Sequence, residues 1–170
     1  PNLERAQRTV ERIIRDANAA SDVVGRIRAL FRQGVEARTS AAMGSIVAEA
    51  RDLMAEELAR KGVRVDVAVA DDVPAVVVDR VQIQQVLVNV MRNGIEAMEL
   101  IAGERTLTLN ISRAGDLVRT EIVDQGLGVA NPERIFEPFF TTKGAGMGMG
   151  LAICRSIVES HGGRLWAESA

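Results

Sequence analysis

Nine apolar residues recur through the first 31 positions of the chain at alternating intervals of three and four. They are Leu3, Ala6, Val10, Ile13, Ala17, Ala20, Val24, Ile27 and Phe31. This heptad spacing predicts one long helix with a narrow apolar stripe. Such a helix is not stable alone, so it constrains the fold by requiring a partner surface. The narrow stripe favours a bundle or a dimer, and the alternative is a helix packed on its own domain.

After this segment the sequence changes to shorter helices mixed with strands. Residues 32–44 predict a connector with room for a short strand. A helix is predicted over residues 45–61, where a glycine stops it, and the strict alternation of residues 63–69 predicts a half-buried strand. Residues 75–78 predict a short buried strand.

Asp79 is expected to cap the following helix, with Gln82 three residues later as in a capping box. The later predicted elements are a helix over 82–98, hairpin strands over 105–112 and 116–124, a helix over 151–160 and a last strand over 164–168. This mixture predicts an α+β fold in which helices cover a sheet. We expect two domains, residues 1–36 and residues 37–170.

Composition argues against several classes of protein. The chain has 170 residues, a net charge of −2 and a single Trp, so we expect no nucleic-acid partner. Its one cysteine, Cys154, cannot form an internal disulfide and fits a reducing compartment. The sequence contains neither a signal peptide nor an apolar run of membrane-spanning length. We therefore expect a cytoplasmic location and no membrane contact from this chain, and any membrane anchor of the parent protein would lie in segments outside it.

The helix over 82–98 carries a polar stripe beside its apolar one. The stripe consists of Gln82, Gln85, Asn89, Asn93 and Glu96, at steps of three and four residues. Asn is a poor residue for a helix interior, so two of them one turn apart need a reason. Their oxygens would suit Mg²⁺ shared with substrate phosphates. The alternative is a solvated helix face.

A second unusual position is the end of the strand over 116–124. Asp124 has the same parity as Val118 and Ile122, which form the apolar face of that strand. A carboxylate on that face needs a donor or a ligand. Gly126 and Gly128 would let a flat ligand approach the backbone, although a simple turn is the alternative.

A glycine-rich run leads into the helix over 151–160. Gly146, Gly148 and Gly150 precede Leu151, where the free amides of a helix start attract phosphate. Thr141, Thr142 and Lys143 come just before the glycines. The spacing matches neither a Walker loop nor the dinucleotide fingerprint, and a flexible linker is the alternative.

Together these segments resemble the nucleotide boxes of sensor histidine kinases. The stretch "NVMRNGIEAM" resembles their asparagine box, and "DQGLGV" resembles their first glycine box. "IFEPFFTTK" is similar to their phenylalanine box, and "GMGMGLAI" to their second glycine box. The resemblance covers residues 40–169 and implies a Bergerat-type (GHKL) ATP-binding sandwich, with helices on one face of a mixed sheet. Residues 1–36 resemble the second helix of the dimerisation and phosphotransfer hairpin.

The resemblance also implies roles for individual residues. The implied nucleotide-binding set is Asn89, Arg92, Asn93, Glu96, Asp124, Gly126, Gly128, Thr141, Thr142, Lys143, Gly146, Met147, Gly148, Gly150 and Leu151. Within it, Asn93 would bind Mg²⁺, Asn89 and Lys143 would act in catalysis, and Asp124 would accept a hydrogen bond from the adenine amino group. Residues 129–147 would form a lid shaped by the bound triphosphate, and Phe136, Phe139 and Phe140 would tether it to the core.

The sequence departs from the family pattern in two ways. It lacks the first hairpin helix with the phosphoacceptor histidine, and its one histidine, His161, lies at a helix end where a dipole partner is expected. The closing pair of strands is also missing, so we expect part of a larger kinase that is inactive in autophosphorylation alone.

The function implied is transfer of the γ-phosphoryl of ATP to a histidine, for relay to the receiver domain of a response regulator. The implied partners are that regulator and a second copy of the kinase, paired through the hairpin helix. Related ATPases of the gyrase, mismatch-repair and heat-shock chaperone type are one alternative, but they use a carboxylate base where this chain has Asn89. Serine-directed kinases that act on anti-sigma antagonists share the boxes without the long helix. A nucleotide-sensing dimeric scaffold is the non-enzymatic alternative.

Overall fold

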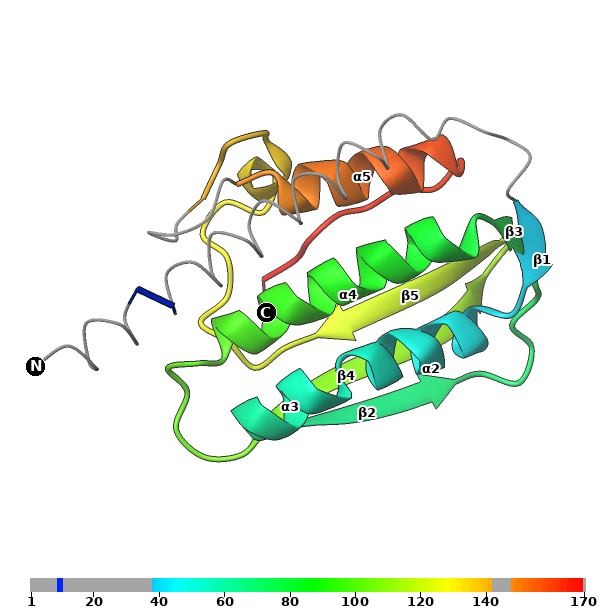
Figure 1. Ribbon diagram of the computed structural model, residues 1–170. Coiled ribbons are helices and arrows are strands. Elements are labelled where there is room, and N and C mark those ends of the chain that lie inside the picture. Colours follow the sequence, from blue (N-terminus) through cyan, green and yellow to red (C-terminus); the bar gives the residue numbers. More distant parts are fainter. Residues whose placement is uncertain (1–8, 11–37, 142–147, 170) are drawn as a thin grey trace, which may run out of the picture. The chain divides into compact units, whose positions relative to one another are not determined.

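The computed structural model describes residues 9–10, 38–141 and 148–169 (Figure 1). The chain divides into two units, residues 1–36 and residues 37–170. Most of the predicted heptad helix lies outside the described residues, and its two described positions, Thr9 and Val10, are helical. The following description concerns the second unit.

Five strands form two sheets in the described part of this unit. They are β1 (Thr39–Ala41), β2 (Val63–Val69), β3 (Val76–Val78), β4 (Arg105–Ala114) and β5 (Leu117–Val123). β1 and β3 pair antiparallel as a small sheet of their own. The larger sheet has the order β2-β4-β5, with β2 parallel to β4 and β4 antiparallel to β5. The predicted mixed sheet and the β4–β5 hairpin are confirmed, and Gly115 makes the turn with a φ of 64°.

Helices cover one face of the larger sheet (Figure 1). They are α2 (Met43–Leu53), α3 (Ala55–Lys61), α4 (Arg80–Ala97) and α5 (Gly150–Ser160), with a short 3₁₀ turn η2 (Arg134–Phe136). The prediction of one helix over 45–61 is wrong, because the chain leaves helical geometry at Met54, whose ψ is 1°. The Met54 amide is shared between the carbonyls of Ala50 and Arg51, as is common at a helix end.

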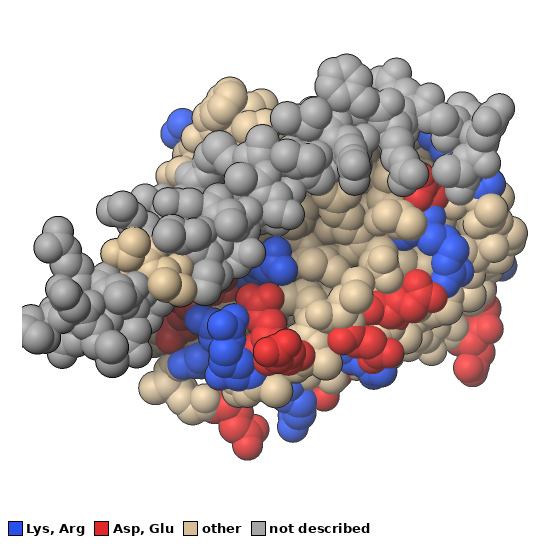
Figure 2. Space-filling model, viewed as in Figure 1, with Lys and Arg blue, Asp and Glu red and all other residues tan. Residues whose placement is uncertain are grey.

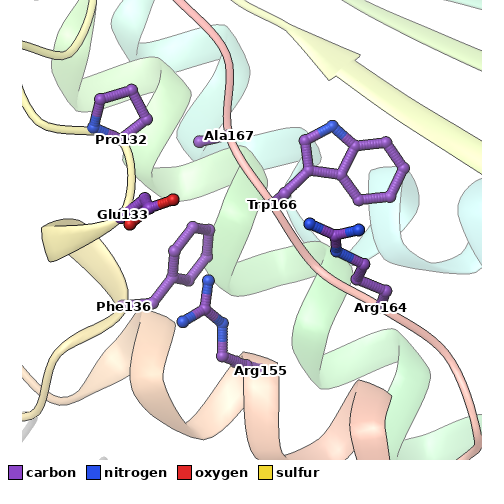
Figure 3. Close-up of a pocket in the computed structure, with 7 residues that line it drawn as sticks. All are labelled: Pro132, Glu133, Phe136, Arg155, Arg164, Trp166 and Ala167. Carbon is purple, nitrogen blue, oxygen red and sulfur yellow. The ribbon is translucent and has the colours of Figure 1, made fainter.

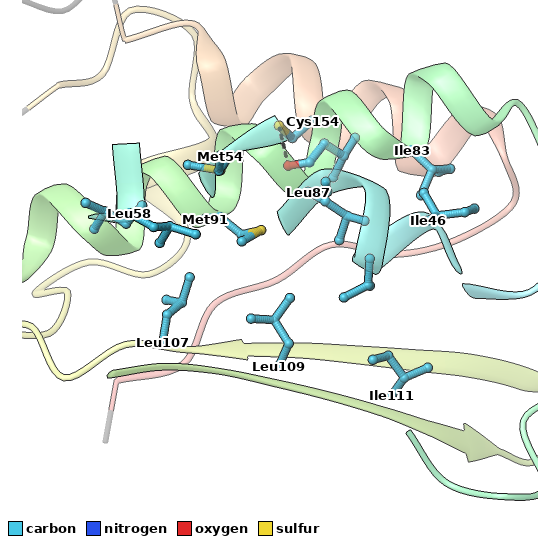
Figure 4. Packing of buried hydrophobic residues seen from close by; sticks show 14 of the residues in the cluster. Ile46, Met54, Leu58, Ile83, Leu87, Met91, Leu107, Leu109, Ile111 and Cys154 are labelled. Carbon is cyan, nitrogen blue, oxygen red and sulfur yellow. Dashed lines mark hydrogen bonds between the residues drawn. The ribbon is translucent and has the colours of Figure 1, made fainter. Parts of the chain in front are cut away.

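The core lies between β4 and the helices (Figure 4). Leu107, Leu109 and Ile111 alternate along β4 and are 0–2% exposed. From the helices, the largest fully buried side chains include Ile46, Met54, Met91, Ile95 and Met98. Met91 and Ile95 complete the apolar stripe of α4. That helix is therefore anchored along its whole length.

The N-terminal cap of α4 makes only one of the two kinds of hydrogen bond that the predicted capping box requires. The Asp79 side chain accepts hydrogen bonds from the amides of Val81 and Gln82 at 3.0 and 3.2 Å, as a cap residue should. The amide of Asp79 itself does not go to the Gln82 side chain. It donates to Nε2 of His161 at 3.1 Å, so a residue at the end of α5 completes the cap.

The predicted last strand over residues 164–168 is also wrong. These residues lie near β5, since the guanidinium of Arg119 is 5.6 Å from the centre of the Trp166 ring. Val129 also donates its amide to Oγ of Ser169 at 3.2 Å. No strand is assigned there in the described chain, because these contacts use side chains and no backbone ladder joins the segment to β5.

Acidic and basic side chains are intermixed on the helix-covered face (Figure 2). Ion pairs join neighbouring elements there, including Arg80 with Glu49 and Lys61 with Glu99. Within the described ranges, no helix is both long and apolar enough to cross a bilayer.

Candidate nucleotide site

α4 supplies four of the predicted site residues, and they lie on its half-buried side. Asn89, Arg92, Asn93 and Glu96 are all partly exposed, whereas the interleaved Met91 and Ile95 are buried. The polar stripe is therefore neither core nor open surface. The Asn93 amide nitrogen donates to the backbone carbonyl of Asn89 at 2.9 Å. This bond fixes the side chain through its nitrogen, so the atom a cation would need, Oδ1, is not used in it.

Arg92 points differently from the two asparagines. Its Nε is 3.3 Å from Oε2 of Glu57 in α3, and both side chains are partly buried. The guanidinium thus links α4 to α3. A role in nucleotide binding stays a prediction for Arg92.

Asp124 follows the end of β5 and lies directly against α4. A Cβ atom placed on Gly94 would be 3.3 Å from Cβ of Asp124 and 3.6 Å from its Oδ2. The glycine that follows Asn93 therefore allows the carboxylate to approach the helix. The parity argument is half right: Asp124 faces α4, yet it is exposed rather than buried in the core.

The Asp124 carboxylate is oriented by its own turn. Oδ1 accepts the amide of Gly126 at 2.8 Å, and Gln125 Oε1 accepts the amide of Thr106 at 3.0 Å, which holds the turn to β4. Among the described residues, no other hydrogen bond to this carboxylate is found, which leaves Oδ2 as an acceptor for a ligand. Gly126 packs on Ala97, where an added Cβ would lie 2.8 Å from the Ala97 methyl.

Gly128 has a φ of 73°, a conformation that favours glycine. The space beside it is bordered by Ser169. The φ value already explains why this residue is glycine, without the predicted contact with a base.

α5 runs antiparallel to α4, so its start comes level with the asparagines. Cys154 Sγ is 4.0 Å from the Val86 carbonyl, and the His161–Asp79 bond follows the same register. Because both helices rise 1.5 Å per residue, the same alignment of α5 with α4 places Gly150 level with the stretch between Asn89 and Asn93. The free amides of the first turn of α5 and the polar stripe of α4 therefore share one region.

The lid region is described in part. Gly148 has a φ of 63°, and an added Cβ would lie 2.6 Å from the carbonyl carbon of Phe139. This close contact joins the second glycine box to the phenylalanine box. Thr141 is exposed. Four other predicted residues, Thr142, Lys143, Gly146 and Met147, lie outside the described residues.

The three lid phenylalanines behave differently. Phe136 is 6% exposed and lies 4.1 Å from the guanidinium of Arg155, so it is a tether as expected. Phe140 is half-buried, with Arg134 4.8 Å from its ring. The expectation for Phe139 is wrong: it is 74% exposed, because a φ of 67° turns the chain outward there.

Arg155 also lines a cavity of about 380 Å³ that the sequence did not predict. Its walls are Pro132, Glu133, Phe136, Arg155, Arg164, Trp166 and Ala167 (Figure 3). None of the predicted nucleotide residues lines it. The cavity forms where cationic and aromatic residues from separate parts of the chain come together. Sequence spacing does not predict such pairings, so the sequence could not have indicated it.

The site's donor set fits a nucleotide with Mg²⁺. Two asparagine oxygens are too few to hold a cation alone, and no group of three His, Cys, Asp or Glu suited to a metal occurs among the described residues. Magnesium usually completes such a set with water and phosphate oxygens. The helix start at Gly150 offers amides to phosphate, and Asp124 offers an acceptor to an amino group.

This arrangement of α4, the β5 turn and the start of α5 defines an ATP-binding domain of the histidine kinase class. Residues 78–170 match the model of the histidine kinase-, DNA gyrase B- and HSP90-like ATPase family, and the chain belongs to that family.

Known relatives favour the kinase branch. The sensor protein FixL of Bradyrhizobium diazoefficiens is 35% identical over 99% of this chain, which spans 34% of the length of FixL. The catalytic domain of histidine kinase ThkA superposes with a TM-score of 0.67 and 31% identity, over 77% of this chain and 88% of that domain.

Two further solved structures carry bound molecules. Full-length ShkA in complex with AMPPNP has a TM-score of 0.67 and 28% identity, over 78% of this chain and 28% of ShkA. ThkA in complex with the response regulator TrrA covers 100% of this chain and 49% of ThkA at 24% identity, with a TM-score of 0.77, which shows a shared fold.

Proposed function

We propose that residues 37–170 bind Mg-ATP and donate its γ-phosphoryl group to a histidine on a hairpin domain. In this transfer the bond from the γ-phosphorus to the bridging oxygen breaks, a phosphorus–nitrogen bond forms, and ADP leaves. The phosphoryl group would then pass to the receiver domain of a response regulator. The observation that carries the proposal is the contact of Asp124 with Gly94, in the helix that bears Asn89 and Asn93.

In this proposal each residue has a simple task. Asp124 Oδ2 accepts a hydrogen bond from the adenine amino group, while Gly126, which has no side chain, leaves room for the base beside the backbone. Asn89 and Asn93 direct their side-chain oxygens at the cation, and bound Mg²⁺ would neutralise phosphate charge. Phosphoryl transfer depends mostly on positioning and charge neutralisation, so these tasks suffice.

Lys143, Thr141 and Thr142 are proposed to hold the phosphates together with the amides from Gly146 to Leu151. Arg92 and Glu96 are proposed to border the same site from α4. Kinase transfer is favoured over rapid hydrolysis because Asn89 is a neutral amide, which cannot take a proton from water.

The proposed partners beyond the nucleotide concern the longer protein. The heptad pattern of residues 1–36 supports a homodimer through a hairpin helix. The ThkA–TrrA complex supports a response regulator as the receiving partner. We place this domain in the cytoplasm, where ATP and the regulator are available.

A calorimetric titration tests the nucleotide site. ADP and a non-hydrolysable ATP analogue are titrated with and without Mg²⁺ into wild type, Asp124→Asn and Asn93→Ala. We expect Asp124→Asn to abolish binding of both nucleotides, and Asn93→Ala to remove the gain that Mg²⁺ gives.

Two control variants are matched to these changes. Asp116→Asn changes an exposed carboxylate in the β4–β5 turn, and Gln84→Ala removes an α4 amide that contacts Glu49. Both should bind as wild type. Absence of Mg-dependent binding in the wild type would refute the proposal.

The transfer step needs a separate assay. A hairpin domain carrying the phosphoacceptor histidine is supplied with labelled ATP, and acid-labile phosphoprotein is measured beside free phosphate. Steady hydrolysis without phosphoprotein would favour the ATPase alternative. Binding with neither product would favour a nucleotide-sensing scaffold.

A further inference from the structure

His161 joins the end of α5 to the start of α4. Its Nδ1 is 2.8 Å from the carbonyl of Ile157, within α5. Its Nε2 is 3.1 Å from the amide nitrogen of Asp79, which is 82 residues away in the sequence. The imidazole thus bridges two helices that both contribute to the candidate nucleotide site.

The two hydrogen bonds require one form of the ring. A backbone N–H is always a donor, so Nε2 must be the unprotonated acceptor. A backbone carbonyl is always an acceptor, so Nδ1 must carry the proton toward Ile157. His161 therefore makes both contacts only as the neutral Nδ1–H tautomer.

The bridge also completes a buried cap. Asp79 is the one charged residue in the described core, at 9% exposure. Its carboxylate accepts the first amides of α4, and its own amide has the His161 ring as acceptor. Loss of the ring would leave that amide without this acceptor in a partly buried place.

Because of the position of this bridge, a small tilt of α5 there would move the first turn of the helix at the candidate site. α5 has 11 residues, so its first turn lies about 15 Å from His161. A tilt of about 10° at the bridge would therefore move the first turn of α5 by about 2.5 Å. That turn carries the amides proposed for phosphate, beside Asn89 and Asn93.

We propose that neutral His161 is a positioning residue for nucleotide binding: it fixes α5 on the start of α4 and thereby sets the phosphate amides against the asparagines. This inference rests on the proposed function of the site. It assigns His161 no contact with the nucleotide.

Two substitutions separate the roles of the ring. His161→Gln offers an oxygen at about the place of Nε2. His161→Asn offers an oxygen only near the place of Nδ1. Affinity for a non-hydrolysable ATP analogue with Mg²⁺ is measured for all three proteins, together with hydrogen exchange of the Asp79 amide.

His161→Gln should bind the nucleotide within about twofold of wild type and keep the Asp79 amide protected, because it restores the acceptor. His161→Asn should bind about fivefold more weakly than wild type, with an unprotected Asp79 amide.

Wild-type affinity in His161→Asn would overturn the positioning role while leaving the proposed function intact. An equal loss of affinity in His161→Gln and His161→Asn would do the same. If none of the three proteins binds nucleotide, the proposed function itself fails, and the positioning role fails with it.

Discussion

Gly94 lies between the core and the candidate site, and a single methyl group added at this position tests whether the two are linked. A Cβ atom on Gly94 would lie 2.8 Å from Cδ1 of Leu107 and 3.3 Å from Cβ of Asp124. Leu107 is fully buried, so its methyl group has no open space to enter. Gly94→Ala must therefore push α4 away from β4, or displace Asp124.

Two opposing effects set the magnitude. Ala is favoured over Gly in a helix interior by about 1 kcal/mol. Overpacking a well-packed core costs about 1–3 kcal/mol. The expected change in the free energy of unfolding is therefore a loss of about 0–2 kcal/mol.

Gly44→Ala in α2 is the matched control. Its added Cβ would approach Cγ2 of Val69 at 3.4 Å, an ordinary contact. This variant keeps the helix-propensity gain without the clash. We therefore expect Gly94→Ala to be less stable than Gly44→Ala by about 1–3 kcal/mol.

The assay is urea unfolding without nucleotide, followed by titration with the ATP analogue. Gly94→Ala should also bind the nucleotide more weakly, because Asp124 is displaced, whereas Gly44→Ala should bind as wild type. A Gly94→Ala protein as stable as the control and with wild-type affinity would refute this account of the contact.

Two other substitutions test the lid and the cap. Gly148→Ala should be less stable than Gly62→Ala and should lose nucleotide affinity. The two glycines have φ values of 63° and 62°, but only Gly148 has a close neighbour, the backbone of Phe139. Thermal unfolding and titration of both variants measure this, and equal behaviour would exclude the backbone contact as the cause. Asp79→Ala should lose about 1–2 kcal/mol of stability through the two α4 amides that it caps. Asp79→Asn, which retains an acceptor, should lose less in the same urea experiment, and an equal loss in both would contradict capping as the source.

Much of the fold could be predicted from the sequence because its signals are local. The alternation of residues 63–69 and the turn at Gly115 each involve neighbours along the chain, and the strand and the hairpin turn form as predicted. The expected half-burial of that strand is only partly right, because Val67 and Val69 are exposed. The polar stripe of α4 was visible for the same reason, since a helix brings every third and fourth residue to one side.

The errors concern contacts between distant parts of the chain. Gln82 stands where a capping box needs it, but the Asp79 amide bonds to His161, and no sequence spacing predicts a partner 82 residues away. Residues 164–168 have the composition of a strand, but strand formation requires a backbone partner as well as propensity. Phe139 is apolar yet exposed, because its backbone φ directs it outward.

α4 links stability to nucleotide binding because its two sides cannot move independently. Met91 and Ile95 fix one side in the core, and Asn89 and Asn93 share the same turns on the other. Gly94 lies between them and contacts both Leu107 and Asp124, so core packing determines how near the carboxylate comes to the asparagines. Core substitutions along this helix should therefore change stability and affinity together. A variant that changes affinity alone must act on groups outside that contact, as Asn93→Ala is expected to do by removing the side-chain amide proposed to bind the cation.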